Sequence, residues 1–192
     1  MFDIPLSLKF DNRYICAVLD IGIEVLCCNY ICSKLQCNRI NETTIVVVCV
    51  VISIVKLFIA NSRIKMRIGL GIIYDKTPFE LANNYAKTDI RINKKFKYKD
   101  NYDFYKKYYA KVKDNYNVQV KNAEFCIFRD CAYLLFVNFV LAIVLTLKYN
   151  FLYILILIFF VIYIFFVAIT KNKAREFVLQ IMIENYRRQK CQ

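Results

Sequence analysis

The stretch from Phe151 to Thr170 constrains the fold most, because its twenty consecutive residues include no charged side chain. A helix of that length spans roughly 30 Å, which matches the hydrocarbon thickness of a bilayer. A water-soluble fold would have to bury this helix on all sides, and 59% of the 192 residues are hydrophobic, so little polar chain remains to cover it. The sequence therefore predicts an all-α integral membrane protein.

Two further apolar segments extend this prediction. Residues 43–60 contain one charge, Lys56, close to one end, where a flexible ammonium group is expected to snorkel to the interface. Cys131–Leu147 is a second segment, and only Lys148, Tyr149 and Asn150 separate it from the run described above. We therefore expect a transmembrane helix over residues 43–60 and a tight C-terminal transmembrane hairpin over residues 125–170.

The N-terminal segment, residues 1–42, leaves the number of spans open at three or four. Residues 14–32 are apolar enough for an extra span but contain Asp20 and Glu24, which lie four residues apart and so on one face of a helix. An acidic pair inside the hydrocarbon region is costly, and where it occurs it marks a functional site. The alternation of Ile21, Ile23 and Val25 with other residues is also compatible with a strand.

Basic residues are distributed unevenly along the chain, and this predicts its orientation. Residues 61–124 hold fifteen Lys and Arg against seven Asp and Glu, and residues 171–192 hold six against two, whereas residues 1–42 hold four against five. Basic loops remain in the cytoplasm, and a hairpin returns the chain to the side it left. We expect a multi-pass protein of the inner (plasma) membrane, with the connection 61–124 and the C-terminus cytoplasmic.

The connection is expected to form a small basic helical module. The capping-box sequence Thr77-Pro78-Phe79-Glu80 predicts a helix from Pro78 to about Ile90. A second helix is predicted from Asp100 to about Tyr116, with a packing seam formed by Tyr102, Tyr105, Tyr109, Val112 and Tyr116.

The basic side chains of this module are expected to lie off the seam and to face water, anionic lipid or a partner: Arg63, Lys65, Arg67, Lys106, Lys107, Lys111 and Lys113. Nucleic-acid binding is disfavoured, because aromatic side chains that stack on bases must be exposed. The amphipathic tail, residues 171–192, has an apolar stripe that could lie on the bilayer, pack on the module or mediate assembly: Ala174, Phe177, Val178, Ile181 and Met182.

The chain has no histidine and three glycines, which argues against the common forms of acid–base, metal and phosphate-loop chemistry, so no enzyme activity and no cofactor are predicted. Cys27, Cys28, Cys32 and Cys37 match no metal-binding spacing, and their redox state depends on the side of the membrane they face. Asn138 lies near the middle of a predicted span, where its amide can bond to a neighbouring helix or face a pore.

At the cytoplasmic entrance of the same span, Arg129 and Asp130 are candidates for coupling a cytoplasmic event to the membrane. They can pair with each other, with lipid headgroups or with the helices of the module.

This layout of a few spans, a tight C-terminal hairpin and a basic module bearing the TPFE and EFCIFRD segments resembles the compact membrane effectors and accessory proteins of bacterial anti-phage systems. Those that accompany CRISPR and cyclic-nucleotide signalling are included in the likeness. The resemblance implies self-association and disruption of the inner membrane when a partner signals. It transfers no role to a particular residue.

Taken together, the residues and the layout favour a non-enzymatic membrane protein that forms homo-oligomers, perturbs the membrane or forms a pore, and is controlled by a cytoplasmic protein partner through its module. The alternative is a membrane anchor or scaffold that recruits a protein, anionic lipid or nucleic acid through the helix rich in Lys and Tyr. A transporter or membrane enzyme is a third hypothesis, which rests on Asp20 and Glu24 being intramembrane.

Overall fold

The computed structural model describes residues 12–34, 42–59, 62–71, 101–147 and 153–190, and every regular element in these ranges is helical. The helices are α1 (Asn12–Lys34), α2 (Glu42–Ile59), α3 (Ser62–Gly69), α6 (Asn101–Phe104), the π-helical turn η2 (Tyr105–Tyr109), α7 (Ala110–Val112), α8 (Tyr116–Thr146) and α9 (Tyr153–Lys190). The prediction of an all-helical chain is confirmed for these residues. The helix predicted from Pro78 and residues 148–150 of the predicted hairpin turn lie outside them.

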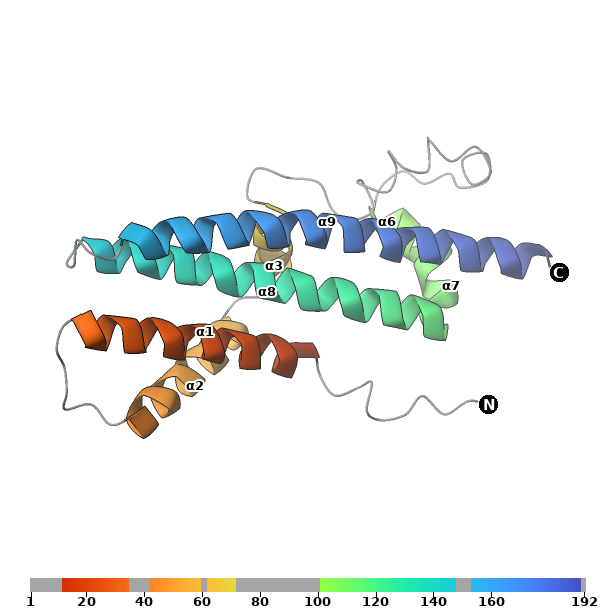
Figure 1. Cartoon of the computed structure of the whole chain (residues 1–192). Helices are drawn as coiled ribbons and strands as arrows, with labels where there is room; N and C mark the ends of the chain where they lie inside the picture. The colour runs from red at the N-terminus through yellow and green to blue at the C-terminus, as the bar shows by residue number, and fades with distance from the viewer. Residues whose placement is uncertain (1–11, 35–41, 60–61, 72–100, 148–152, 191–192) are drawn as a thin grey trace.

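Helices α8 and α9 pack along each other as a long antiparallel pair (Figure 1). Neither contains glycine or proline, the residues that most disfavour a helix interior, so 31 and 38 residues run without a break. Asn115 caps the start of α8, its Oδ1 accepting from the backbone N of Asn117 at 2.9 Å. At 1.5 Å per residue the two helices are roughly 47 and 57 Å long.

Both long helices pass from a polar half into an apolar half. We define the polar half as α6, η2, α7, residues 116–124 of α8 and residues 171–190 of α9, and the apolar half as α1, α2, residues 125–146 of α8 and residues 153–170 of α9. Its core contains Leu70 at the end of α3 together with Phe104, Val112, Val118, Phe125, Ala174, Phe177, Val178, Ile181 and Met182. The apolar stripe of the tail is therefore packed against the module, which is one of the three roles it was given.

The predicted tyrosine seam is only partly correct. Val112 is fully buried and Tyr109 is half-buried, but Tyr105 and Tyr116 are exposed. The helix also ends at Val112, and Tyr116 begins α8. The π-helical turn η2 inserts an extra residue per turn, so Phe104, Tyr108 and Val112 share the buried face instead.

Three helices are long and apolar enough to cross a membrane: Ile15–Ser33 in α1, Tyr116–Thr146 in α8 and Tyr153–Gln189 in α9. The two helices of the predicted hairpin are among them. The third is the segment whose status the sequence left open, and its residues Ile21, Ile23 and Val25 are helical rather than strand-like. In α2 the apolar stretch whose side chains are described is shorter, Thr43–Lys56, and the helix itself continues to Ile59.

Helix α1 runs beside α8 in the same direction. Cys16 Sγ donates to the backbone O of Ile127 at 3.2 Å, and further along both helices Asp20 contacts Asn138. Helix α2 then crosses back against α1 and contacts α8 as well (Figure 1). This arrangement brings three helices together in the apolar half, at the level of Asp20 and Asn138.

Helix α3 docks on α8 through a close backbone approach at Gly69. A Cβ atom at this position would lie 2.8 Å from Cγ and 2.9 Å from the backbone O of Arg129. Gly71, two residues later, has a φ of 94°, in the left-handed region that ends a helix and favours glycine. Glycine at 69 therefore fixes the distance between α3 and α8.

We expect Gly69→Ala to lower the free energy of unfolding by about 1 to 3 kcal/mol, the usual cost of inserting a group into a close-packed contact. Gly22→Ala is the matched control, because nothing lies within 4 Å of its Cβ position in α1. There the better helix propensity of alanine should make the change neutral or stabilising. Thermal unfolding in detergent micelles measures both, and equal melting temperatures would contradict the packing of α3 on α8.

Candidate functional site

A cluster of buried polar side chains joins α1, α2 and α8 in the apolar half. It consists of Asp20 and Glu24 from α1, Ser53 and Lys56 from α2, and Asn138 from α8. Asp20, Ser53, Lys56 and Asn138 are each at most 6% exposed, and the side chain of Glu24 is 11% exposed. We call these five residues the charged cluster.

The geometry of the charged cluster centres on the ammonium group of Lys56. Its Nζ donates to Glu24 Oε1 and to Asn138 Oδ1, and lies 3.4 Å from Asp20 Oδ2. Asn138 returns a hydrogen bond from Nδ2 to Asp20 Oδ1 at 2.7 Å. Each of the three helices therefore contributes at least one partner to the same closed network.

The remaining member of the charged cluster, Ser53, bridges the two acids. Its Oγ lies 2.8 Å from Asp20 Oδ2 and 3.1 Å from Glu24 Oε2. Helical spacing explains the arrangement, because Asp20 and Glu24 are four residues apart on α1 and Ser53 and Lys56 are three apart on α2. The face of α1 that carries Asp20 and Glu24 thus packs against the face of α2 that carries Ser53 and Lys56.

Three of these five residues were predicted as site residues from the sequence, and two were not. Asp20 and Glu24 were candidates as an intramembrane pair, and Asn138 as an interhelix or pore residue; the structure brings them together. Lys56 was expected to snorkel to an interface, and this expectation is wrong, because the ammonium group turns inward to two carboxyl groups. Ser53 and Lys56 could have been found as the polar members of one face of residues 43–60.

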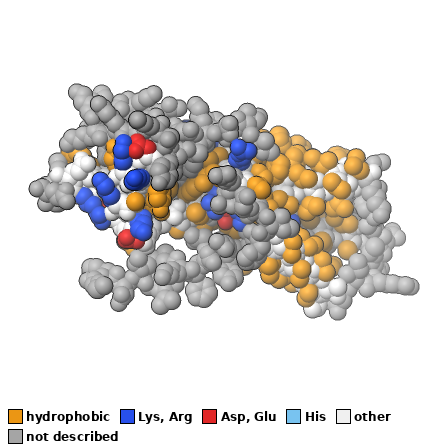
Figure 2. Space-filling model, turned by 180° about the vertical axis from the view of Figure 1, so that it is seen from behind, with side chains coloured by type: hydrophobic (Ala, Val, Ile, Leu, Met, Phe, Trp, Pro, Cys, Tyr) orange, Lys and Arg blue, Asp and Glu red, His pale blue; other side chains and the backbone are white. Residues whose placement is uncertain are grey.

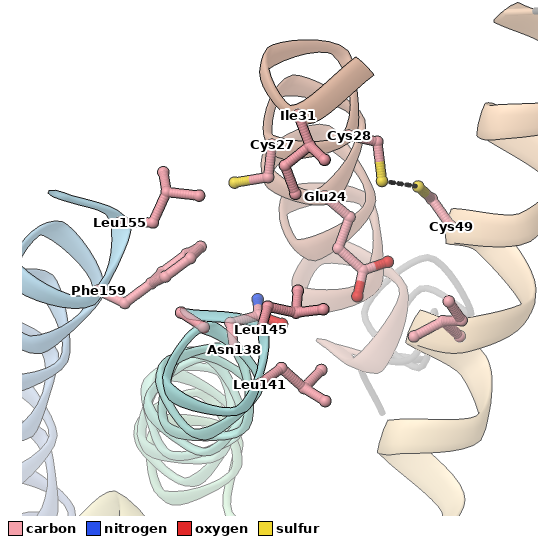
Figure 3. A pocket seen from close by; sticks show the side chains of 12 residues that line it. Glu24, Cys27, Cys28, Ile31, Cys49, Asn138, Leu141, Leu145, Leu155 and Phe159 are labelled. Carbon is pink, nitrogen blue, oxygen red and sulfur yellow. Dashed lines mark hydrogen bonds between the residues drawn. The ribbon is translucent and has the colours of Figure 1, made fainter. Parts of the chain in front are cut away.

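Two cavities flank the charged cluster along the axis of α1 and α8. The larger, of about 160 Å³, reaches Glu24 and Asn138 and extends along later turns of both helices, to Ile31 and Leu145. Figure 3 shows Glu24, Cys27 and Cys28 projecting from α1, with Asn138, Leu141 and Leu145 on α8 and Leu155 and Phe159 on α9.

The smaller cavity, of about 90 Å³, reaches Asp20 and lies along earlier turns of the same helices, between Cys16 and Leu134. Its other walls are apolar side chains or thiols from α1, α8 and α9: Leu19, Ile23, Cys131, Leu135, Ile162 and Phe166. Each carboxyl group of the charged cluster therefore borders a different cavity.

Two pairs of thiols lie close to these cavities, and each joins α1 to another helix. Cys28 Sγ lies 3.8 Å from Cys49 Sγ on α2, and Cys131 Sγ on α8 donates to Cys16 Sγ at 3.1 Å. All four are free thiols, as are Cys27 and Cys32, whereas Cys37 lies outside the described residues. Within the described part of the chain, no three His, Cys, Asp or Glu side chains are grouped to hold a metal ion.

The other predicted site residues lie apart from the charged cluster. Arg129 pairs with Asp130, Nε to Oδ1, at 2.8 Å, one of the alternatives given to them. Lys65 is buried, with its Nζ 5.7 Å from the centre of the Tyr133 ring, whereas Arg67, Lys106, Lys107, Lys111 and Lys113 are exposed. Lys107 pairs with Asp103 at 2.8 Å. The side chain of Arg63 lies outside the described residues.

A second group of charges links the polar ends of α8 and α9, beyond their apolar segments. Lys121 and Lys173 each contact Glu124 and Glu176, at 2.9 to 3.0 Å. Hydrogen bonds from Lys121 and then Lys173 hold the pKa of Glu176 below its ordinary value. These side chains are a quarter to nearly half exposed, so water and salt screen the pairs. They tie two helices together, and none of them lines either of the two cavities described above.

Comparisons with protein-family models, curated proteins and solved structures find no match to this chain.

We expect Lys56→Met to lower the free energy of unfolding by about 3 to 5 kcal/mol, because it leaves two buried carboxyl groups without their cation. The triple variant Asp20→Asn, Glu24→Gln, Lys56→Met removes all three charges and should recover most of that loss. Val55→Met, on the exposed face of α2, is the control. Denaturant titration in micelles measures all three, and a Lys56→Met variant as stable as Val55→Met would contradict the charged cluster.

We also expect mild oxidation of the membrane-bound protein to form disulfides between Cys28 and Cys49 and between Cys16 and Cys131. Each reaction transfers two electrons and two protons to the oxidant, and needs only a small approach of the two sulfur atoms. Peptide mapping by mass spectrometry identifies the pairs. Cys49→Ala should abolish the first disulfide and leave the second, and dominant pairing of Cys28 with another thiol would contradict the packing of α1 on α2.

Proposed function

We propose that this chain is a non-enzymatic, multi-pass membrane protein that lets ions cross the membrane, at a rate that a partner bound to its polar half can change. The charged cluster is the observation that carries the proposal. Charged side chains inside apolar helices are costly, and where they persist they typically line ion pathways or proton relays. Here they also connect the three helices whose separation would open such a pathway.

The surface supports insertion into a bilayer. Large apolar side chains are exposed along one half of the molecule, and charged side chains gather toward the other (Figure 2). On α9 alone the exposed ones include Tyr153, Ile154, Leu157, Ile158, Phe160, Val161, Ile164 and Phe165. Soluble proteins rarely expose a contiguous apolar patch of more than a few hundred Å².

The direction of the helices supports a four-crossing arrangement. Helices α1 and α8 run the same way and α9 runs back, so α1 would leave the side of the polar half and α2 would return to it. Both chain ends would then share one side. The excess of Lys and Arg in residues 61–124 and 171–192 favours the cytoplasm for that side.

The continuity of α8 supports coupling between the two halves. The helix begins in the polar half at Tyr116 and carries Asn138 in the charged cluster, roughly 33 Å away along one unbroken helix. A displacement of its first turns therefore reaches the hydrogen bonds that Asn138 makes to Asp20 and Lys56. Coupling of this kind needs an element with two arrangements, and a closed polar network between packed helices can supply it.

Exposed lysines on the polar half favour a second candidate, a membrane anchor that recruits an acidic partner. Lys106, Lys111 and Lys113 are exposed along η2, α7 and the turn after α7. In this version the membrane helices are inert, and charge reversal of the three lysines would abolish recruitment without altering permeability.

The permeability test uses the full chain in vesicles of phosphatidylethanolamine and phosphatidylglycerol. We expect wild-type protein to dissipate at least one of two imposed gradients, of potassium or of protons, about tenfold faster than protein-free vesicles, a difference of roughly 1.4 kcal/mol in barrier. The triple variant that neutralises Asp20, Glu24 and Lys56 should be no faster than lipid alone. Gradients that persist equally with every variant would overturn the proposed function and favour the anchor.

A subunit count by mass photometry in nanodiscs accompanies this test. Self-association into a ring is the form in which narrow spans can surround a water-filled pore, so an oligomer supports a pore between protomers. A monomer that still carries current would place the pathway within one chain.

A further inference from the structure

The formal charges of the charged cluster do not cancel. Two carboxyl groups, Asp20 and Glu24, face one ammonium group, Lys56, while Ser53 and Asn138 are neutral. Within the described residues, the contacts of this network include no second cation. A net negative charge enclosed by apolar helices is costly, and one bound proton removes it.

The position of Ser53 indicates where that proton lies. Both Asp20 Oδ2, at 2.8 Å, and Glu24 Oε2, at 3.1 Å, are within hydrogen-bond distance of Ser53 Oγ. A hydroxyl group has one hydrogen to donate and two lone pairs to accept with. Both contacts are satisfied only when Ser53 donates to one carboxylate and the other carboxyl group, protonated, donates to Ser53. The geometry thus fits a single proton shared across three oxygen atoms.

We propose that Asp20, Ser53 and Glu24 form a proton relay between the two cavities of the apolar half. The inference rests on the proposed function and specifies its permeant ion and its path. A proton enters at Asp20 from the smaller cavity and leaves at Glu24 through the larger one, or travels in the reverse direction.

The transfer step balances without a co-reactant. The protonated carboxyl group of Asp20 gives its hydrogen to Ser53 Oγ while the hydroxyl group of Ser53 gives its own hydrogen to the carboxylate of Glu24. Asp20 becomes a carboxylate, Glu24 becomes a carboxylic acid and the serine hydroxyl is regenerated. Rotation of the hydroxyl group resets the relay for the next proton.

Lys56 and Asn138 are positioning residues. Lys56 Nζ donates to Glu24 Oε1 and lies 3.4 Å from Asp20 Oδ2. Asn138 Nδ2 donates to Asp20 Oδ1 at 2.7 Å. These contacts keep both carboxyl groups directed toward Ser53. The other titratable groups at the cavities are thiols: Cys27 and Cys28 on α1, Cys49 on α2, and Cys16 and Cys131 at the smaller cavity. Helix α9 contributes only Leu155, Phe159, Ile162 and Phe166 to the two linings, and none of these titrates.

The cavities make the relay more than a structural contact. A buried ion pair that only joins helices needs no open space on either side, whereas a relay must receive and release protons. Here the two spaces border different acids and lie on opposite sides of Ser53 along α1 and α8. On α1 the lining of the smaller cavity ends at Ile23 and that of the larger one begins at Glu24.

The test measures proton uptake into vesicles of phosphatidylethanolamine and phosphatidylglycerol that contain an internal pH dye, driven by a potassium diffusion potential set with valinomycin. Potassium leak is measured separately without valinomycin. We expect wild-type protein to pass protons and to exclude potassium. Ser53→Ala and Glu24→Gln should reduce proton uptake at least about tenfold. Ser53→Thr, which keeps the hydroxyl group, should retain it, and so should Glu176→Gln on the polar half.

A second measurement does not depend on transport. The apolar reagent dicyclohexylcarbodiimide reacts with protonated carboxyl groups in apolar surroundings, so peptide mapping should find it attached to Glu24 at the larger cavity. It should not be attached to Glu176, which is partly exposed and paired with Lys121.

The outcomes separate this inference from the proposed function. Vesicles that leak potassium and protons alike, with no effect of Ser53→Ala, would uphold a permeability function and overturn the relay. Vesicles that are tight to both ions, with Glu24 unlabelled, would overturn both. Proton flux lost in Ser53→Ala and kept in Ser53→Thr, in variants that melt like wild type, supports the relay.

Discussion

The ammonium group of Lys56 is the interaction on which the apolar half depends. Without it, α1 would bring two carboxyl groups into an apolar environment with only neutral partners, and Ser53 would be the one residue of α2 left in the charged cluster. Buried ion pairs contribute little net stability compared with apolar packing, but they are strongly selective for one register. Because Asn138 of α8 joins the same network, this selectivity extends to the helix that reaches into the polar half.

Much of the fold follows from composition and spacing. The uncharged run 151–170 and the apolar segment before it predicted the two long helices, since no glycine or proline interrupts either. The buried stripe of the tail was found because Ala174, Phe177, Val178, Ile181 and Met182 recur at helical spacing, and all are buried. The π-helical turn at Tyr105–Tyr109 was not foreseeable from periodicity, and it shifts the buried face of its helix toward Phe104 and Tyr108.

The candidate site was half predictable, for a physical reason. Polar or charged residues are easily recognised inside apolar segments, and this is how Asp20, Glu24 and Asn138 were predicted. Lys56 stood out too, but a lysine near the end of a span satisfies its charge equally well at the membrane surface or against an acid. That choice depends on tertiary contact. The sequence does contain one feature that favours contact with an acid. Asp20 and Glu24 share one face of α1, and Ser53 and Lys56 share one face of α2, so the two polar faces can pack together.

The lengths of α8 and α9 have a consequence for what stands outside the lipid. At roughly 47 and 57 Å, the two helices exceed a hydrocarbon core of about 30 Å by about 17 and 27 Å. The paired helices would therefore project beyond the headgroups on one side as a rigid extension of the spans. A partner of protein size could then approach the polar half from water without first contacting the bilayer.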